Sequence, residues 1–137
     1  MLIVVCVAGL AYALLPHGAE ICTASGIVVD QNSSGLGDVP VTLHVMGQSP
    51  GYNGIQELYG QTNVTAGGPP FQGLVVFANV TLPIGAKYAY MDANMTLANG
   101  TAVYGRSTDF SMNASEAASE WIVMPVPTQP LPAPVPA

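Results

Sequence analysis

Hydrophobic and polar positions divide the chain into three parts. Residues 2–15 are an uninterrupted apolar run without a charged side chain, and Pro16 follows it. Residues 23–124 alternate between short apolar stretches and polar turns, while residues 125–137 contain six prolines. We therefore predict an apolar N-terminal segment over 1–22, one folded domain over 23–124 and an extended Pro-rich tail over 125–137.

The middle part predicts a mainly β domain. Its apolar stretches are short, several alternate with polar residues, and Gly, Pro or Asn separates them, which is typical of strands joined by turns. Asn99-Gly100 is a strong signal for a tight hairpin turn. About seven such strands are the signature of an Ig-like β-sandwich. The predicted strands are 25–30, 39–46, 55–61, 73–82, 87–97, 101–110 and 121–124.

Two aromatic residues are the expected anchors of the core. Phe77 lies within the apolar stretch 73–82, and Trp121, the only tryptophan, begins the last predicted strand. Aromatic side chains supply much of the hydrophobic area that a core buries. We predict that Phe77, on a central strand, and Trp121, on a terminal strand, are both buried in the sandwich.

Residues 2–15 have to be kept out of water, and three environments would achieve this. As a helix the segment would be about 21 Å long, and because it is apolar on every side it could pack against copies of itself along a filament axis. The β-branched residues between Ile3 and Val7 could instead form a strand donated to a neighbouring sheet. A signal peptide or membrane anchor is the third alternative, although a bilayer span needs about 20 residues.

The first two environments have the same consequence, which is that other copies of the chain bury the segment. In both of them the chain forms a homopolymer, because the apolar side chains are removed from water by neighbouring subunits. The predicted assembly residues are Leu2, Ile3, Val4, Val5, Val7, Leu10, Tyr12, Leu14 and Leu15.

The chain is poor in charge, and this excludes two classes of partner. Charged residues make up 7% of the sequence, with two basic and eight acidic side chains and a formal net charge of −6. Binding to nucleic acid requires basic side chains on the phosphates, and so does attraction to an anionic membrane surface. Neither partner fits a chain whose only Lys and Arg are Lys87 and Arg106.

Asparagine placement suggests what hydrates the surface in place of charge. Six of the seven asparagines lie in Asn-x-Ser/Thr sequons. One such motif is an ordinary polar turn, but six predict N-glycosylation, which places the protein outside the cytoplasm, in an organism with N-glycosylation. The predicted glycosylation sites are Asn32, Asn63, Asn79, Asn94, Asn99 and Asn113.

No set of residues in the sequence points to catalysis. Gly-x-Ser-x-Gly and the phosphate-binding glycine motifs are absent, and the only histidines are His17 and His44. The only cysteines, Cys6 and Cys22, could form a disulfide, or Cys6 could be a small buried hydrophobe, and no Cys or His cluster has metal-ligand spacing. We expect no enzyme, no catalytic or metal site, and no cofactor other than covalent N-linked glycans.

Several polar and aromatic residues have both a structural and a binding interpretation. Asp30 and Asp38 flank one turn and could bind Ca²⁺, but such sites usually have more clustered carboxylates, so capping and turn roles are favoured. Tyr88, Tyr90 and Tyr104 could form a face that contacts sugars, although their alternate spacing is more typical of packing within a sheet.

Two stretches of the middle part resemble a known family. GIVVDQNSSGLGDVPVTL (26–43) resembles the opening hairpin of carboxypeptidase-regulatory-like domains, the transthyretin-like branch of Ig-like sandwiches, with a strand ending in Asp, a Gly-bearing loop and a Val-x-Val-Thr-Leu strand. Residues 71–93 resemble their second signature, with Phe77, Val80, Pro83, Gly85 and Tyr88 at matching positions. The resemblance implies a structural or adhesive module, with a longer insertion over 47–70 than the pattern contains.

The apolar segment is similar to the N-terminal helix of archaeal type IV pilins, which precedes a glycosylated β-domain. This resemblance implies a pilus-like cell-surface filament. We therefore expect a structural and adhesive subunit of an extracellular, N-glycosylated helical homopolymer. The alternative is a membrane-anchored cell-surface module that binds glycans through its tyrosines.

Overall fold

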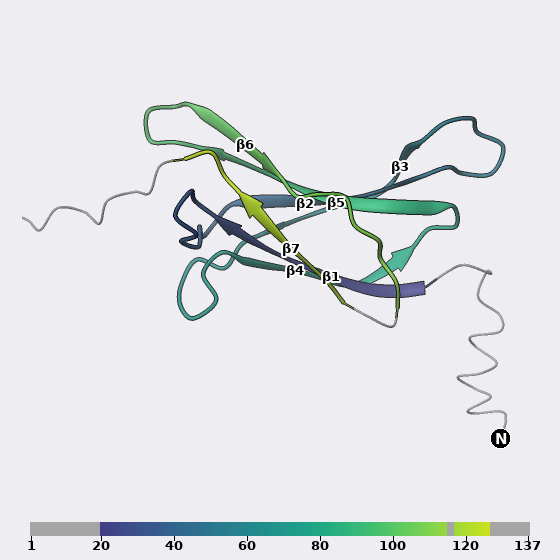
Figure 1. The fold of residues 1–137 in the computed structure, drawn as a ribbon, viewed down its shortest axis with the longest axis horizontal. Coiled ribbons are helices and arrows are strands. Elements are labelled where there is room, and N and C mark those ends of the chain that lie inside the picture. Colours follow the sequence, from purple (N-terminus) through teal and green to yellow (C-terminus); the bar gives the residue numbers. More distant parts are fainter. Residues whose placement is uncertain (1–19, 115–116, 127–137) are drawn as a thin grey trace, which may run out of the picture.

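Seven strands form two sheets that lie face to face (Figure 1), in a computed structural model that describes residues 20–114 and 117–126. The described chain is mainly β, as the alternating pattern predicts. The strands are β1 (Glu20–Val29), β2 (Pro40–Gly47), β3 (Gln56–Val64), β4 (Leu74–Leu82), β5 (Ala86–Thr96), β6 (Ala102–Arg106) and β7 (Ala118–Val123).

The chain crosses repeatedly between the two sheets. The four-stranded sheet has the order β3-β2-β5-β6 and is antiparallel throughout, whereas the three-stranded sheet has the order β4-β1-β7. In the latter, β1 pairs antiparallel with β4 and parallel with β7. Because β1 and β2 belong to different sheets, residues 26–43 connect the two layers and do not form the expected hairpin. Figure 1 also shows that the start of β1 and the described end of the chain after β7 lie toward opposite ends of the long axis.

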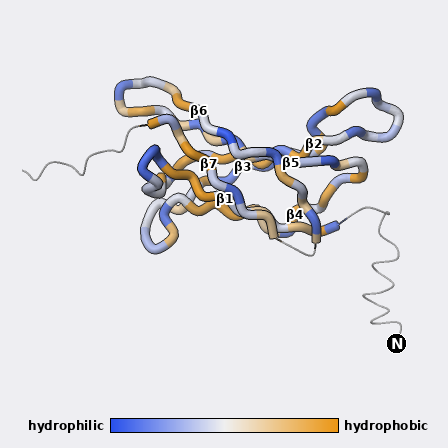
Figure 2. The backbone as a smooth tube through the Cα atoms, in the orientation of Figure 1, coloured by the Kyte–Doolittle hydropathy of each residue, from blue (hydrophilic) through white to orange (hydrophobic). Residues whose placement is uncertain are grey.

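The core lies between the sheets and is built from alternate positions of their strands. In β2, Val41, Leu43 and Val45 are fully buried, while the intervening Thr42 and His44 are only partly buried. Successive side chains of a strand point to opposite faces, so one face of each sheet supplies the core. Figure 2 shows the resulting hydrophobic stretches along the strands, with hydrophilic residues in several turns.

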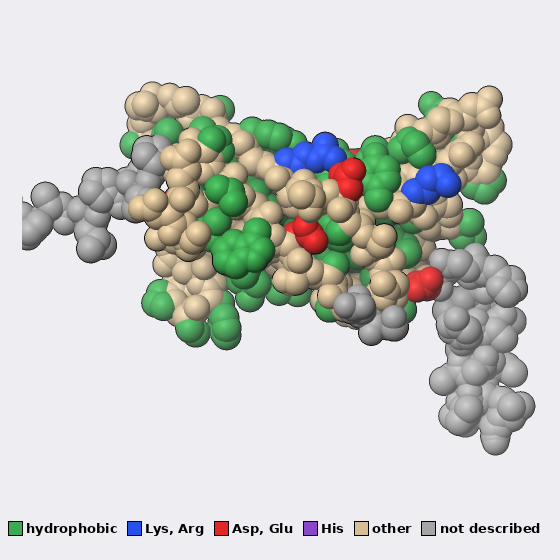
Figure 3. Space-filling model, in the orientation of Figure 1, with side chains coloured by type: hydrophobic (Ala, Val, Ile, Leu, Met, Phe, Trp, Pro, Cys, Tyr) green, Lys and Arg blue, Asp and Glu red, His purple; other side chains and the backbone are tan. Residues whose placement is uncertain are grey.

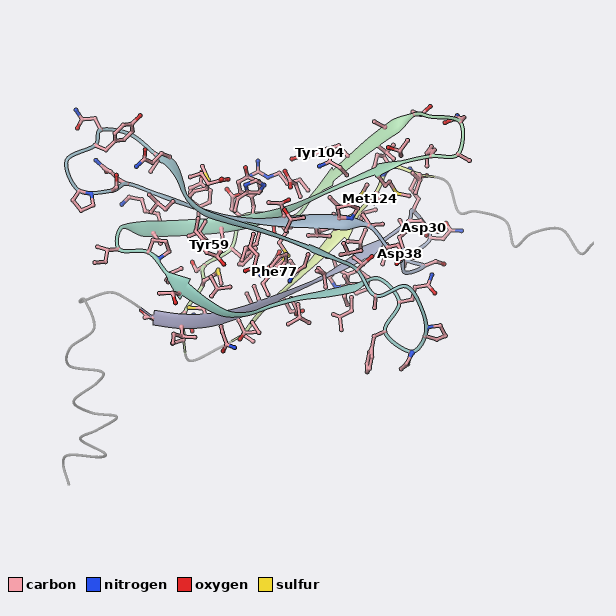
Figure 4. All side chains as sticks on the ribbon, turned by 180° about the vertical axis from the view of Figure 1, so that it is seen from behind. Asp30, Asp38, Tyr59, Phe77, Tyr104 and Met124 are labelled. Atoms are coloured by element: carbon pink, nitrogen blue, oxygen red, sulfur yellow. The ribbon has the colours of Figure 1, made fainter. Side chains whose placement is uncertain are left out.

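Of the two predicted aromatic anchors, Phe77 is in the core and Trp121 is not. Phe77 is fully buried, and Figure 4 shows it between the sheets, although its strand β4 is an edge strand and not a central one. Trp121 is 58% exposed, so the prediction of its burial is wrong. The register of β7 on β1 places Ile122 opposite Val28 on the core side, and alternation then directs Trp121 outward.

Several strand boundaries differ from the prediction. β6 ends at Arg106 and does not reach residue 110, whereas pairing with a neighbouring strand extends other strands. β1 begins at Glu20, five positions before the predicted start, because Glu20 to Cys22 pair with the end of β4. The described domain therefore reaches into the range assigned to the N-terminal segment. β3 continues to Val64 because it pairs with β2 as far as Pro40.

The turns follow the predicted chemistry. The buried Asp30 carboxylate accepts hydrogen bonds from the backbone N–H groups of Asn32 (2.8 Å) and Ser34 (3.0 Å), which confirms its turn role. The β5–β6 turn contains Asn99, whose side chain accepts a 2.9 Å hydrogen bond from the Thr101 N–H. Gly85 has a φ of +93°, and a Cβ there would lie 2.1 Å from the carbonyl oxygen of Gln48, so only glycine fits.

Some expectations concern residues outside the described ranges. The apolar run 2–15, Cys6 and the Pro-rich residues 127–137 are among them. Cys22 is buried and forms no disulfide with a described residue, and burial together with the charge of Glu20 raises the pKa of its thiol.

The different positions of the two aromatic residues predict different costs of truncation. Phe77→Ala should lower the free energy of unfolding by about 3–5 kcal/mol, because it leaves a cavity in the core. Trp121→Ala, the matched control on the surface, should cost less than about 1 kcal/mol. Urea unfolding followed by circular dichroism measures both, and a larger loss for Trp121→Ala than for Phe77→Ala would contradict the packing described.

Candidate functional site

A row of polar and aromatic side chains crosses all four strands on the outer face of the sheet β3-β2-β5-β6. It is hereafter the His44 row. The cross-strand pairing of His44 with Tyr90 and of Asp92 with Arg106 places these residues side by side. The row consists of Glu57 from β3, His44 from β2, Tyr90 and Asp92 from β5, and Tyr104 and Arg106 from β6.

His44 lies between two carboxylates. Its Nδ1 contacts Glu57 Oε1, and its Nε2 is 3.1 Å from Asp92 Oδ1. The other oxygen of Asp92 accepts a hydrogen bond of 3.1 Å from the Tyr104 hydroxyl. Gly60, the cross-strand partner of His44, leaves room for this arrangement, because a Cβ there would lie 3.1 Å from Glu57 Oε2. Side chains from four strands are thereby joined in one network.

The two carboxylates favour the charged form of His44. Burial alone would lower the pKa of the imidazole, but the hydrogen bonds and negative charges of Glu57 and Asp92 outweigh it and raise the pKa above its ordinary value. Both ring nitrogens of imidazolium are donors, so each can bind one carboxylate oxygen. Protonation of His44 would thus place a cation between the two carboxylates.

Both neighbouring strands supply a side chain that contacts the ring of Tyr90. The His44 ring is stacked with it at a centroid distance of 4.6 Å and an interplanar angle of 18°. The Arg106 guanidinium carbon lies 3.7 Å from the Tyr90 centroid, and Arg106 also binds Asp109 at 2.6 Å. Tyr90 therefore packs within the sheet, as its spacing favours, and is not a free platform for a sugar ring.

The chemistry available to the His44 row is electrostatic. Both nitrogens of His44 are taken up by carboxylates, and not by the side chain of a described serine, threonine or cysteine. Among residues 20–114 and 117–126, no group of three or more His, Cys, Asp or Glu side chains is placed to hold a metal ion. A cavity of about 180 Å³ does lie near Tyr88 and Met112, but it is smaller than the usual pocket for a small molecule and contains no residue of the row.

The sequons differ in their exposure. Asn32, Asn79, Asn94, Asn99 and Asn113 are exposed, whereas Asn63 is half-buried. Asn79 lies in a strongly apolar strand, yet its backbone has a φ of +56°, in the left-handed region that asparagine tolerates well. It therefore stands out from β4 into solvent.

Side chains of the Asn63 sequon form hydrogen bonds within the fold. The side-chain nitrogen of Asn63 donates a 2.8 Å hydrogen bond to the carbonyl oxygen of Val76 and so links β3 to β4. The buried Thr65 hydroxyl donates to the Leu36 carbonyl (2.7 Å) and accepts from the Val39 N–H (2.9 Å). The sequence motif does not reveal these contacts, because they come from strands that are distant along the chain.

Comparison of the chain with family models, with curated proteins and with solved structures found no match. Within the described ranges, no helix has the length and apolar character required to cross a bilayer. The assembly residues between Leu2 and Leu15 lie outside those ranges.

The raised pKa of His44 predicts a pH-dependent stability. A group whose pKa is higher in the folded state stabilises the fold below its unfolded pKa, and this contribution is lost as the pH rises through the folded pKa. The free energy of unfolding should therefore fall from about pH 6 upward, since the pKa of an unperturbed histidine is about 6.5. His44→Gln, which cannot ionise, should remove this part of the slope in urea titrations, and identical slopes for both proteins would contradict the assignment.

Proposed function

We propose that this chain is a structural subunit of an extracellular, N-glycosylated filament in which residues 2–15 bind neighbouring copies. The filled core is the observation that carries the proposal. A Cβ on Gly26 would lie 2.8 Å from the sulfur of Met91, and one on Gly105 would lie 2.6 Å from that of Met124. Core side chains therefore fill the space beside both glycines, which supports burial of the apolar segment outside the sandwich.

The energy of that burial is large for a chain of this size. Residues 2–15 contain eight Leu, Ile and Val side chains, and complete burial of each is worth about 1.5–3 kcal/mol. Their burial is thus worth on the order of 12–24 kcal/mol before the cost of ordering. Neighbouring subunits provide the surface for it in a homopolymer.

The positions of the two ends of the described domain support polymerisation in one direction. The start of β1 and the described end after β7 lie toward opposite ends of the sandwich (Figure 1). A contact between a segment at one end and a surface elsewhere on the next copy is heterologous, and heterologous contacts that do not close into rings form open helical filaments. The two ends therefore suit a head-to-tail subunit.

We include the type of β-sandwich in the same proposal. Three strands facing four, with a turn at Gly85 and Phe77 in the core, support an Ig-like sandwich of the carboxypeptidase-regulatory-like type. Such a module serves a structural or adhesive role, and we propose no catalytic activity for it. The alternative glycan-binding module has less support, since the ring of Tyr90 is in contact with His44 and Arg106.

The glycans can be tested on the native protein. Its intact mass should lie well above 14.1 kDa and fall to about that value after deglycosylation. Peptide mapping should find the five exposed sequons occupied and Asn63 occupied least, because its amide nitrogen is hydrogen-bonded. Asn53, which is exposed but lies outside any sequon, is the control. A native mass near 14.1 kDa would exclude glycosylation.

Assembly can be tested by charge substitutions in the apolar segment. Leu10→Asp or Val5→Asp should abolish the filaments seen by negative-stain microscopy, because a buried unpaired carboxylate is costly, while circular dichroism still shows the β-domain. Ile84→Asp makes a comparable change at an exposed position in the β4–β5 turn and should leave the filaments intact.

Two other outcomes would overturn the proposal. Filaments of unchanged diameter after deletion of 2–15 would place the assembly contact elsewhere. Partition of the intact chain into lipid vesicles as a monomer, with a soluble folded domain after the deletion, would favour the membrane-anchored alternative.

A further inference from the structure

Part of the outer face of the sheet β4-β1-β7 is apolar, and the outward positions of its strands carry no charged side chain. Ile27 on β1 pairs with Leu74 on one side and with Trp121 on the other, so the three form a continuous row across the sheet. Val76 and Val123 lie on the same face and are 44% and 55% exposed. These five residues are hereafter the Trp121 face.

The two outer faces of the sandwich differ in their charged side chains. The outward positions of β1, β4 and β7 are Ile, Leu, Val, Ala, Trp, Ser, Thr or Asn, without one Lys, Arg, Asp or Glu. The His44 row, in contrast, contains two acidic side chains that bind His44 and one arginine that contacts Tyr90. Figure 3 shows the basic side chains along the upper side, over the four-stranded sheet, and hydrophobic ones at several places along the lower side. An exposed apolar patch with a tryptophan is typical of a protein-binding surface.

The chain beyond the Trp121 face is held at the end of the sandwich. The Met124 N–H donates to the Val29 carbonyl at 2.8 Å, and the carbonyl of the buried Val126 accepts from the Gln31 N–H at 3.3 Å. Residues 127–137 therefore start from a fixed point, five positions past Trp121. Their sequence, PTQPLPAPVPA, is uncharged and contains five prolines.

We propose that the Trp121 face of one copy binds residues 127–137 of a neighbouring copy. Proline-rich chains favour the extended polyproline II form, in which eleven residues span about 34 Å at roughly 3.1 Å each. That form loses little conformational entropy on binding, and aromatic surfaces are its usual receptors. Because residues 127–137 and the Trp121 face are both uncharged, contact between them buries no unpaired charge.

The proline-rich sequence of residues 127–137 disfavours binding to the Trp121 face of the same subunit. To reach its own Trp121, the chain would have to reverse direction just after Val126, which is held by Gln31. Each proline fixes its φ and restrains the residue before it to extended conformations, so alternating prolines resist such a reversal. The inference rests on the proposed homopolymer only in requiring a neighbouring copy, and it does not require residues 2–15.

The single tryptophan makes the contact directly measurable. Trp121 is the only tryptophan, so the protein's tryptophan fluorescence reports on this face alone. In the intact chain, emission should move to shorter wavelength as the protein concentration rises, because the neighbour's tail removes the indole from water. A variant lacking 127–137 should keep the long-wavelength emission at every concentration, and adding a synthetic 127–137 peptide should restore the shift.

Calorimetry with the same peptide and the tail-less variant tests the residue assignment. Trp121→Ala should weaken peptide binding at least about tenfold, as expected for a central interface tryptophan. Tyr52→Ala, which removes an exposed aromatic side chain from the loop between β2 and β3, is the matched control and should leave the affinity unchanged. Equal weakening by both substitutions would overturn the assignment.

Several outcomes would overturn the proposal in distinct ways. Identical emission of the intact and tail-less chains at all concentrations would exclude tail binding, and a shift independent of concentration would mean that the tail binds its own face. A shift that survives tail deletion but disappears on deletion of 2–15 would assign the face to the apolar segment. If filaments form but the tail-dependent emission shift is missing, the proposed function stands and only this contact is refuted. If the shift is seen but no filaments form, this contact stands and the proposed function is refuted.

Discussion

The pairing of β1 with a strand on each side is the constraint on which the rest of the structure depends. β1 pairs antiparallel with β4 and parallel with β7, and this double register determines which residues of both neighbours face the other sheet. Val28, Phe77 and Ile122 thereby enter the core from three adjacent strands. A slip of β7 by one residue would bury Trp121 and expose Ile122, so register decides the character of both faces.

The shortage of charge then makes the two outer surfaces of the sandwich different. Glu57, Asp92 and Arg106 are on the four-stranded sheet, where they bind His44 or Tyr90 and hold neighbouring strands together. The strands of the other sheet present no charge outward. One face is therefore a closed polar network, while the other exposes apolar area that a second chain can cover. This division is what relates the sandwich to the proposed homopolymer.

The components of the His44 row could not be assigned from the sequence. Glu57 and Asp92 are 13 and 48 positions from His44, and nothing in their local pattern connects them. They meet because β3 and β5 pair on either side of β2. The sequons are the opposite case, since Asn-x-Ser/Thr is visible in the sequence. Even there, the hydrogen bond that sets Asn63 apart arises from the packing of β3 beside β4.

Local pattern determined the class of the fold, the seven strands and the chemistry of their turns. The two-residue period of strands and the special backbone needs of positions such as Asp30, Gly85 and Gly100 depend on neighbours along the chain, so a sequence displays them. The run Trp121-Ile-Val-Met124 is apolar at every position and therefore contains no signal for which side faces inward. Only the pairing of β7 with β1 settled that question, and the pairing of β4 with β1 settled the early start of β1 at Glu20. Hydrogen bonds between strands far apart in sequence select the register, and register decides which apolar side chains leave water.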